Sequence, residues 1–396
     1  MLKDKRRGAL GGLLVVLAAA LLGCGGRSEV VAAPEGLSAQ ARLGELIFKD
    51  ASLSASGVQS CATCHDKGAA HGAPNAFPAQ LGGANMDIQG NRQSPTIRYL
   101  ATNKAFTFDK EGTPTGGFFW DGRAASLAEQ AAGPFLNPRE MAMPGKASVV
   151  AKLAEAPYAA DFKQVFGAGI FGDVERAYLC MTLAIQRYEL EDAEFHPFDS
   201  KYDAFLAGKA VLSPQEKRGL ALFNSPAKGN CAACHPSARG ADGAPPMFTD
   251  FTYDVLGVPR NPELKDNADP ASFDLGLAAR AAGDLADRKD LYGAFKVPTL
   301  RNVALRKVFF HNGYFKTLKE AVTFYVQRDT NPEKFYPLNP DGSVNKFNDL
   351  PAAYHANVNV TEAPYNRKPG EAPALTDEEI DDLIAFLNTL TDGYRP

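Results

Sequence analysis

The pattern CxxCH occurs twice in this chain, as CATCH at 61–65 and as CAACH at 231–235. Two thiols three positions apart can form thioethers with the two vinyl groups of one porphyrin, and the adjacent histidine is then held beneath the iron. A zinc site would need a second pair of ligands close by, and a thioredoxin-like motif would need a βαβ context. Neither surrounds these motifs, so the sequence predicts two covalently bound c-type haems. The predicted attachment residues are Cys61, Cys64, Cys231 and Cys234, with His65 and His235 as the iron ligands.

The N-terminal segment indicates export. Basic residues precede an apolar run within residues 1–23 that is too short for a comfortable bilayer span. The letters LLGC resemble a lipoprotein processing site, which would leave Cys24 as a lipid-modified N-terminus; cleavage after Ala32 or Ala33 would instead leave a soluble protein. We expect a signal peptide of the lipoprotein type over 1–23, a linker over 24–36, and a periplasmic protein anchored to a membrane through Cys24.

Composition narrows the class of protein further. The chain has 396 residues, of which 45% are hydrophobic, and a formal net charge of −4. This length and composition allow two or three compact domains and exclude a disordered chain. No excess of basic residues indicates a nucleic-acid partner.

Segments of the first half recur in the second half in the same order. Each CxxCH motif follows a similar apolar segment, LSAQARLGELIF in the first half and LSPQEKRGLALF in the second. The matching ranges are 37–48 with 212–223, 94–98 with 297–301, and 118–134 with 309–325. Such self-similarity predicts a duplicated unit.

Each half is expected to close with an apolar-periodic helix, over 174–188 and over 377–390. Cys180 falls in the first of these helices and is predicted to be a buried thiol. Gly, Pro and Asn interrupt the rest of the chain too often for alternating strands. We therefore predict an all-α protein with long ordered loops, made of two cytochrome c-like domains. The predicted domains are 37–195 with the first haem and 196–396 with the second.

The longest matching pair of segments ends on different residues, Pro134 in the first half and Tyr325 in the second. Proline has neither an N–H nor a side-chain donor, so Pro134 cannot bind iron. Leu318, Val322 and Tyr325 share one helical face, so Tyr325 is either a core residue or a residue directed at the second haem.

Both CxxCH motifs, the stretch WDGRAASLAEQAAGP, the run KVPTLRNVAL and the HNG turn together resemble the bacterial di-haem cytochrome c peroxidase family, which includes MauG and its relatives. The resemblance covers residues 37–390. In the peroxidases proper the position of Tyr325 carries a methionine that binds the second haem, and in MauG-like members it carries tyrosine. The resemblance therefore implies that Tyr325 binds the second iron, where a phenolate favours higher oxidation states.

The same resemblance implies an oxidant, a donor and several site residues. The oxidant is hydrogen peroxide, and the electrons come from a small cytochrome c, a cupredoxin or a residue of a partner protein. Pro134 leaves the first haem open, and Gln130 and Glu140 lie on that open face, where Glu140 moves a proton between the two peroxide oxygens. Without the resemblance they would be a helix-surface Gln and a loop Glu. His71, the histidine that follows His65, is not expected to close this face.

Trp120 is the only tryptophan in the chain. By the resemblance it lies between the haems and passes electrons from one to the other; by itself it would be a large buried ring. His311 occupies the equivalent place in the second half and is expected to be structural.

The resemblance also implies a calcium ion between the two domains, and the matching positions are Gln93, Arg306 and Val308. The residue types differ from the usual ones, but a Gln amide oxygen and two backbone carbonyls are still hard ligands.

Two other functions remain open from the sequence. A di-haem electron-transfer cytochrome without turnover of its own would need strong ligands on both irons. Dioxygen chemistry on a di-haem scaffold would need a hydrophobic substrate channel.

Overall fold

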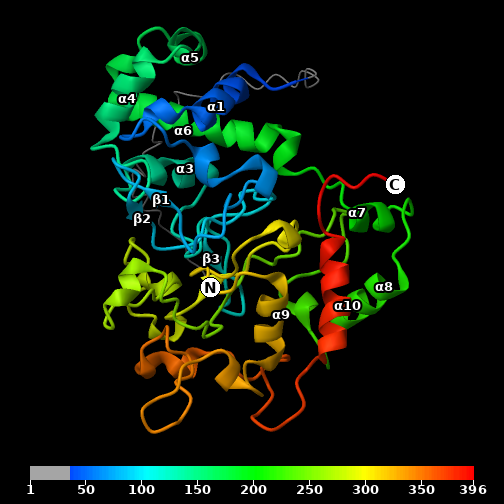
Figure 1. Cartoon of the computed structure of the whole chain (residues 1–396). Helices are drawn as coiled ribbons and strands as arrows, with labels where there is room; N and C mark the ends of the chain where they lie inside the picture. The colour runs from blue at the N-terminus through cyan, green and yellow to red at the C-terminus, as the bar shows by residue number, and fades with distance from the viewer. Residues whose placement is uncertain (1–35) are drawn as a thin grey trace, which may run out of the picture. The chain divides into compact units, whose positions relative to one another are not determined.

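The computed structural model of the chain describes residues 36–396, which form one compact unit (Figure 1). The predicted signal peptide, Cys24 and almost all of the predicted linker lie outside the described residues. Within residues 36–396, no helix combines the length and the apolar character that crossing a bilayer requires.

The unit is helix-rich, with long loops and short 3-10 turns. The α-helices are α1 Ala39–Lys49, α2 Cys61–Cys64, α3 Leu127–Leu136, α4 Lys146–Glu155, α5 Ala159–Phe166, α6 Val174–Glu191, α7 Lys201–Leu206, α8 Pro214–Asn224, α9 Leu318–Gln327 and α10 Asp377–Asn388. The strands are β1 Leu81–Gly82, β2 Ile88–Gln89, β3 Thr107–Phe108, β4 Pro114–Thr115, β5 Tyr253–Asp254 and β6 Phe295–Lys296. They form three antiparallel pairs, β1–β2, β3–β4 and β5–β6. The chain is therefore helix-rich with short strands, and strictly all-α is too strong a description.

Both predicted closing helices form, as α6 and α10. Their starts follow from local sequence, because Asp173 accepts a hydrogen bond from the backbone N–H of Arg176 and Thr376 forms a capping box with Glu379. Helix α8 likewise begins with Ser213 as N-cap and proline at its first turn.

Two helix pairs have the same close crossing. Helix α1 packs against α6, and α8 packs against α10 (Figure 1). A Cβ added at Gly44 would lie 1.9 Å from the carbonyl oxygen of Ala184, and one added at Gly219 would lie 2.0 Å from that of Asp382. Both crossings therefore depend on a glycine that allows the backbones to approach.

The two aromatic-Asx-Gly turns also share their geometry. Phe119 and Phe310 have φ of 65° and 64°, which is uncommon for bulky residues. Each turn is closed by an antiparallel bridge with the same spacing, Phe118 with Ala124 and Phe309 with Phe315.

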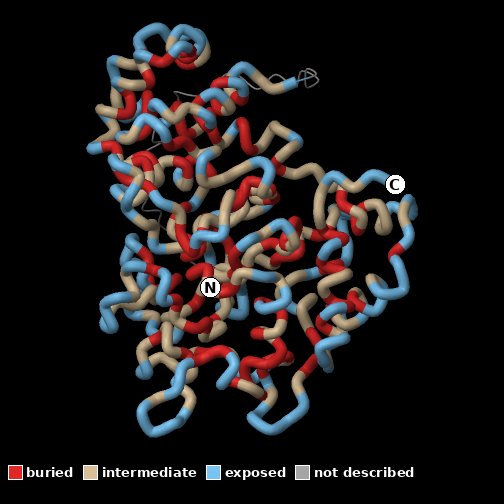
Figure 2. Tube along the Cα trace, in the orientation of Figure 1, coloured by how far each residue is buried: buried red, intermediate tan, exposed pale blue. Residues whose placement is uncertain are grey.

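Buried residues are distributed along the whole described chain, and the exposed residues lie largely in the outer loops (Figure 2). In the second half, Phe223, Phe248 and Phe386 pack edge to face or tilted in one hydrophobic core with α9 and α10. Cys180 is fully buried in α6, as expected, but it is disulfide-bonded, so the prediction of a thiol is wrong.

Candidate functional site

A first cavity, of about 430 Å³, lies at the CATCH motif. Its wall includes Cys61, Cys64 and His65. Ser60 begins α2, and its N–H donates to the Thr63 hydroxyl at 2.9 Å. The Nδ1 atom of His65 lies 3.2 Å from the backbone carbonyl of His71, which leaves Nε2 as the ring nitrogen available to iron.

The predicted open-face residues all line this first cavity: Gln130, Pro134 and Glu140. Gln130 and Pro134 lie one turn apart on α3, and Glu140 lies in the loop that follows. Burial raises the pKa of the Glu140 carboxyl, and the Arg123 guanidinium opposes that shift. The cavity therefore has a carboxyl group whose pKa lies closer to neutrality than that of an ordinary glutamate.

The loop that carries Glu140 is fixed against β1. A Cβ added at Gly82 would lie 2.3 Å from the carbonyl oxygen of Arg139 and 2.8 Å from the Cα atom of Glu140. The N–H of Gly83 donates to the Glu140 carbonyl at 2.8 Å. Only glycine at position 82 allows this approach, so the strand holds the Glu140 backbone in place.

His71 does not line the first cavity. Its ring stacks on Phe195 at 4.4 Å and accepts a hydrogen bond from Arg98 Nε at 3.1 Å. The expectation that His71 leaves the first haem open agrees with this position. Met141, which the sequence did not indicate for this place, is 3% exposed and does line the first cavity.

A second cavity, of about 170 Å³, lies at the CAACH motif. Its wall includes Cys231, Cys234, His235 and Tyr325. His235 Nδ1 lies 2.8 Å from the backbone carbonyl of Phe248, so the arrangement around His65 is repeated. Burial lowers the pKa of His235 to about 4, which keeps the imidazole neutral and able to bind a metal at Nε2.

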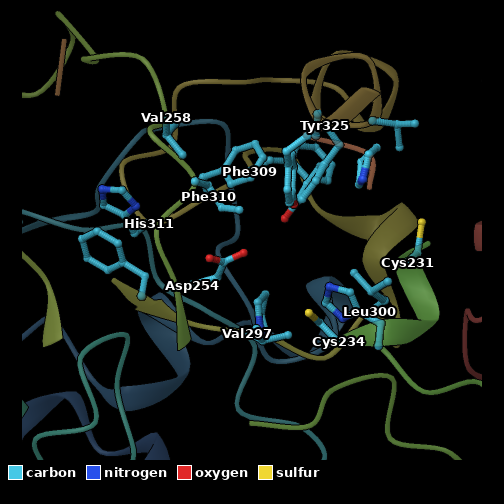
Figure 3. Close-up of a pocket in the computed structure, with 18 of the residues that line it drawn as sticks. Cys231, Cys234, Asp254, Val258, Val297, Leu300, Phe309, Phe310, His311 and Tyr325 are labelled. Carbon is cyan, nitrogen blue, oxygen red and sulfur yellow. The ribbon is translucent and has the colours of Figure 1, made fainter. Parts of the chain in front are cut away.

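Tyr325 projects from α9 into the second cavity. Its ring lies 5.5 Å from that of Phe310 and 5.9 Å from that of Tyr365, measured between centroids. Figure 3 shows its hydroxyl group and the Asp254 carboxylate pointing into the same space. Burial and the charge of Asp254 raise the pKa of Tyr325, whereas the Arg306 guanidinium lowers it. Asp254 was not indicated by the sequence.

Trp120 lines both cavities and is 8% exposed. Its indole N–H donates to the Gln93 carbonyl at 2.8 Å, and its own carbonyl accepts from the N–H of Lys296 at 2.9 Å. Lys296 also lines both cavities, and burial lowers its pKa to about 7. Gln93 from the first half of the chain thus holds the indole ring, and Lys296 from the second half holds the Trp120 backbone.

His311 lines the second cavity and stacks face to face on Phe295, with the centroids 3.5 Å apart. Burial lowers its pKa to about 4. A neutral stacked ring fits the structural role expected for it.

Two of the three predicted calcium ligands come together. Gln93 and Arg306 line one small cavity, and the Gln93 N–H donates to the His311 carbonyl at 2.8 Å. Arg301 and Lys307 line this cavity too, and none of its described lining residues is acidic. Val308 is buried next to it in sequence. Positive charge around the cavity disfavours a divalent cation, and calcium stays a prediction.

The fold and the two cavities define a protein built to hold two haems. Residues 38–211 match the family model described as di-haem cytochrome c peroxidase. The chain is 36% identical over 368 residues to the methylamine utilization protein MauG of Paracoccus denitrificans (strain Pd 1222), covering 90% of each chain. It is 33% identical over 283 residues to cytochrome c551 peroxidase of Nitrosomonas europaea, covering 71% of each.

A solved structure agrees with these relatives. The diheme peroxidase BthA from Burkholderia thailandensis E264 has a TM-score of 0.83 and 39% sequence identity, over 93% of this chain and 91% of that one. The chain therefore belongs to the di-haem cytochrome c peroxidase family and is an oxidoreductase.

Proposed function

We propose that this protein is an exported di-haem peroxidase of the MauG type, with an open first haem and a second haem closed by Tyr325. The observation that carries the proposal is the difference between Pro134 and Tyr325. Each follows its aromatic-Asx-Gly turn by the same number of residues and lines the cavity of its own half. One offers no iron ligand, and the other directs a hydroxyl group into the cavity (Figure 3).

The residues present fit two c-type haems. Each cavity has two cysteine thiols and a histidine whose Nδ1 is engaged by a backbone carbonyl, so that Nε2 faces iron. Cys61, Cys64, Cys231 and Cys234 are free cysteines in the described chain and are available for thioether formation. When bound in the first cavity, haem iron supplies the redox step that reduces hydrogen peroxide to water.

Glu140 handles protons in the first cavity. As a carboxylate it accepts the proton of the incoming peroxide, and as a carboxylic acid it returns that proton to the leaving oxygen. A raised pKa suits both steps, because it reduces the free-energy difference between the carboxylate and the carboxylic acid at neutral pH. Gln130 offers an amide donor and acceptor in the same cavity and orients the peroxide without taking its proton.

Trp120 connects the two cavities. We propose that its indole passes electrons between them, so that the oxidising power produced in the first cavity is shared with the Tyr325 site. The hydrogen bond from the indole N–H to Gln93 supports this role, because it fixes the ring of a residue that lines both cavities.

We further infer that the two halves, 37–195 and 196–396, are copies of one cytochrome c-like unit. The matching glycine crossings, turn dihedral angles and His–carbonyl contacts support this inference, since unrelated segments would have no reason to repeat them in order.

The reducing partner is proposed to be a protein. The name of the Nitrosomonas europaea relative points to a small c-type cytochrome, and a cupredoxin is an equivalent donor. Likeness to MauG favours a Trp or Tyr of a partner protein as the alternative. We also propose a periplasmic location, on the strength of the N-terminal sequence.

The deciding experiment is low-temperature EPR of the fully ferric protein as isolated. One high-spin and one low-spin signal in equal amounts, without a methionine-to-iron absorption band, would match an open first haem and a tyrosine-bound second haem. Two low-spin signals would contradict the proposal. The protein would then be a reductively activated peroxidase or an electron-transfer cytochrome, and Met141, which lines the first cavity, would be the first ligand to test.

A further inference from the structure

Glu189 is a buried carboxyl group in the wall of the first cavity, separate from Glu140. It lies on α6, is 4% exposed, and lines the cavity. Its Oε2 atom has no hydrogen-bond partner within residues 36–396. Burial alone raises its pKa to about 8, so that the carboxyl is mostly protonated at neutral pH.

No charged group among the described residues compensates Glu189. The titratable groups that sense it are the Cys61 thiol, whose pKa rises through burial and through the Glu189 charge, and the Tyr188 hydroxyl. Other charged side chains on α6 and on the elements around it have partners elsewhere: Glu45 with Lys49, Lys146 with Glu175, Glu191 with Arg187, Glu194 with Lys67, and Lys152 with the carbonyls of Ser52 and Ser54. Glu129 of α3 is exposed and accepts the N–H of Ala125.

A haem bound at His65 would bring its vinyl edge, and not its propionates, toward Cys61. The cysteines of a CxxCH motif join the vinyl groups, and the propionates extend from the opposite edge of the porphyrin. Among the charged groups that raise the pKa of Cys61, Glu189 has the largest effect. An iron held by His65 would change charge in the cavity that Glu189 lines, where little solvent would screen the interaction between the two.

A second unsatisfied atom lies in the same wall. Gln59 lines the cavity and is 2% exposed, and its Oε1 atom also has no hydrogen-bond partner within residues 36–396. Its amide N–H₂ group donates to Cys64 Sγ at 3.6 Å, which fixes the orientation of the amide. A protonated Glu189 is a donor and Gln59 Oε1 is an acceptor, so the wall of the cavity holds one unpaired proton donor and one unpaired acceptor.

We propose that Glu189 is a redox-linked proton site of the first haem. When the first haem loses one electron to an oxidant, the carboxyl group loses one proton to water; when the electron donor returns the electron, the proton returns with it. Positive charge in the cavity favours the carboxylate, and its neutralisation favours the acid. The inference rests on the proposed attachment of haem at His65, but not on peroxide turnover.

The test is a spectroelectrochemical titration of the full-length holoprotein from acidic to alkaline pH, following the ferric/ferrous couple of the first haem. In the unmodified protein the potential should fall as pH rises through the region near 8. The equilibrium constant for reduction then changes at most tenfold per pH unit, which corresponds to a limiting slope of about 59 mV per pH unit for one electron. Glu189→Gln should remove this slope and leave the potential flat there. Glu155→Gln, at an exposed carboxyl of α4, should keep it.

An equal slope in Glu189→Gln and the unmodified protein would overturn the inference, as would a flat titration of the unmodified protein near pH 8. If Glu189→Gln fails to fold, redox-difference infrared spectra of the unmodified protein test whether a carboxyl group loses its proton when the first haem is oxidised. Oxidation of the first haem should remove the C=O stretch of a protonated carboxylic acid, and an unchanged band would refute the coupling. Absence of haem at His65 would instead refute the proposed function.

Discussion

The hydrogen bonds that hold the segments around His65 and His235 are the same in the two halves of the chain, but the side chains that line the two cavities differ. Thr96 Oγ1 donates to the Ala70 carbonyl at 2.6 Å, and Thr299 Oγ1 donates to the Met247 carbonyl at 2.6 Å. These bonds fix the segment that follows each CxxCH motif. The shared part of the fold therefore holds a histidine in place, in the same way twice.

The parts that differ lie on the walls of the cavities. The first cavity has Gln130, Glu140 and Pro134, whereas the second is narrower and has the aromatic pair Tyr325 and Tyr365. A polar wall without a ligand suits a small polar oxidant, and an aromatic wall with a hydroxyl group suits a closed iron. The comparison teaches that the repeated backbone holds a histidine in each cavity, while single side chains make the two cavity walls chemically different.

The largest expected effect comes from removing the proton carrier of the first cavity. Glu140→Gln keeps the size of the side chain but cannot accept a proton, so the rate of reaction with peroxide should fall by about 10²–10⁴-fold in stopped-flow absorbance measurements. In the unmodified protein the rate should fall as pH drops through the Glu140 pKa, because only the carboxylate accepts the proton. Burial raises that pKa, so the fall should begin above the pH typical of an exposed glutamate. An undiminished rate would instead favour an electron-transfer cytochrome.

A second comparison concerns the matching arginines of the two halves. Arg301 is fully buried and makes two hydrogen bonds of 2.8 Å to Asp203, whereas Arg98 makes one of 3.0 Å to Asp392. Arg301→Met should lower the free energy of unfolding by about 3–5 kcal/mol, because Asp203 is left buried and unpaired. Arg98→Met should lower the free energy of unfolding by less. Denaturant titrations of both variants measure these losses.

The matched control for these arginines is Arg288→Met. The Arg288 and Asp290 side chains are 43% and 60% exposed, so this change should cost less than about 1 kcal/mol. Equal losses for Arg301→Met and Arg288→Met would show that burial of the pair does not matter.

Tyr325→Met tests the ligand that distinguishes the second cavity. A thioether favours the ferrous state more than a phenolate does, so the potential of the second haem should rise by on the order of 100 mV or more. Tyr365→Phe is the control, because its ring lies against Tyr325 in the same cavity. Similar shifts in both variants, or none in Tyr325→Met, would exclude Tyr325 as the ligand.

Trp120→Phe tests whether the two cavities act together. It keeps an aromatic ring but loses the hydrogen bond to the Gln93 carbonyl. The reaction with peroxide should be unchanged, and oxidation of the protein donor should slow by roughly tenfold, a cost of about 1.4 kcal/mol in the barrier. Equal donor rates would remove Trp120 from the path.

The smallest effect is expected from Met141→Leu. If the first haem is open, the high-spin EPR signal of the ferric protein should be the same in both proteins. A new or stronger high-spin signal in the variant would identify Met141 as a ligand and end the contrast between the cavities.

Much of the fold could be predicted because it depends on neighbours in sequence. The closing helices α6 and α10, and the capping box at Thr376, follow from side chains three or four residues apart. The strands were missed because each has two residues, too few for alternation. The helix pattern at Cys180 predicted its burial correctly, but such a pattern does not show whether the sulfur is bonded.

The site divides in the same way. Gln130, Pro134 and Glu140 were predicted for the first cavity through the family resemblance, and they do line it. Glu189 and Asp254 were not predicted, since no motif marks them and their burial arises only when distant segments pack. Glu189 is one of several acidic residues near the end of α6, and the sequence pattern does not distinguish it from its less buried neighbours.

The sequence by itself determined the two CxxCH sites, the principal helices and the difference between Pro134 and Tyr325 at matching positions of the two halves. Covalent motifs and helix periodicity act over a few residues and can therefore be read directly from the sequence. Only the tertiary structure decided that Trp120 lines both cavities and that Glu189 is buried without a partner. The physical reason is that desolvation and cavity shape are properties of packed surfaces. They come into existence when α1, α3 and the loops after them close around α6.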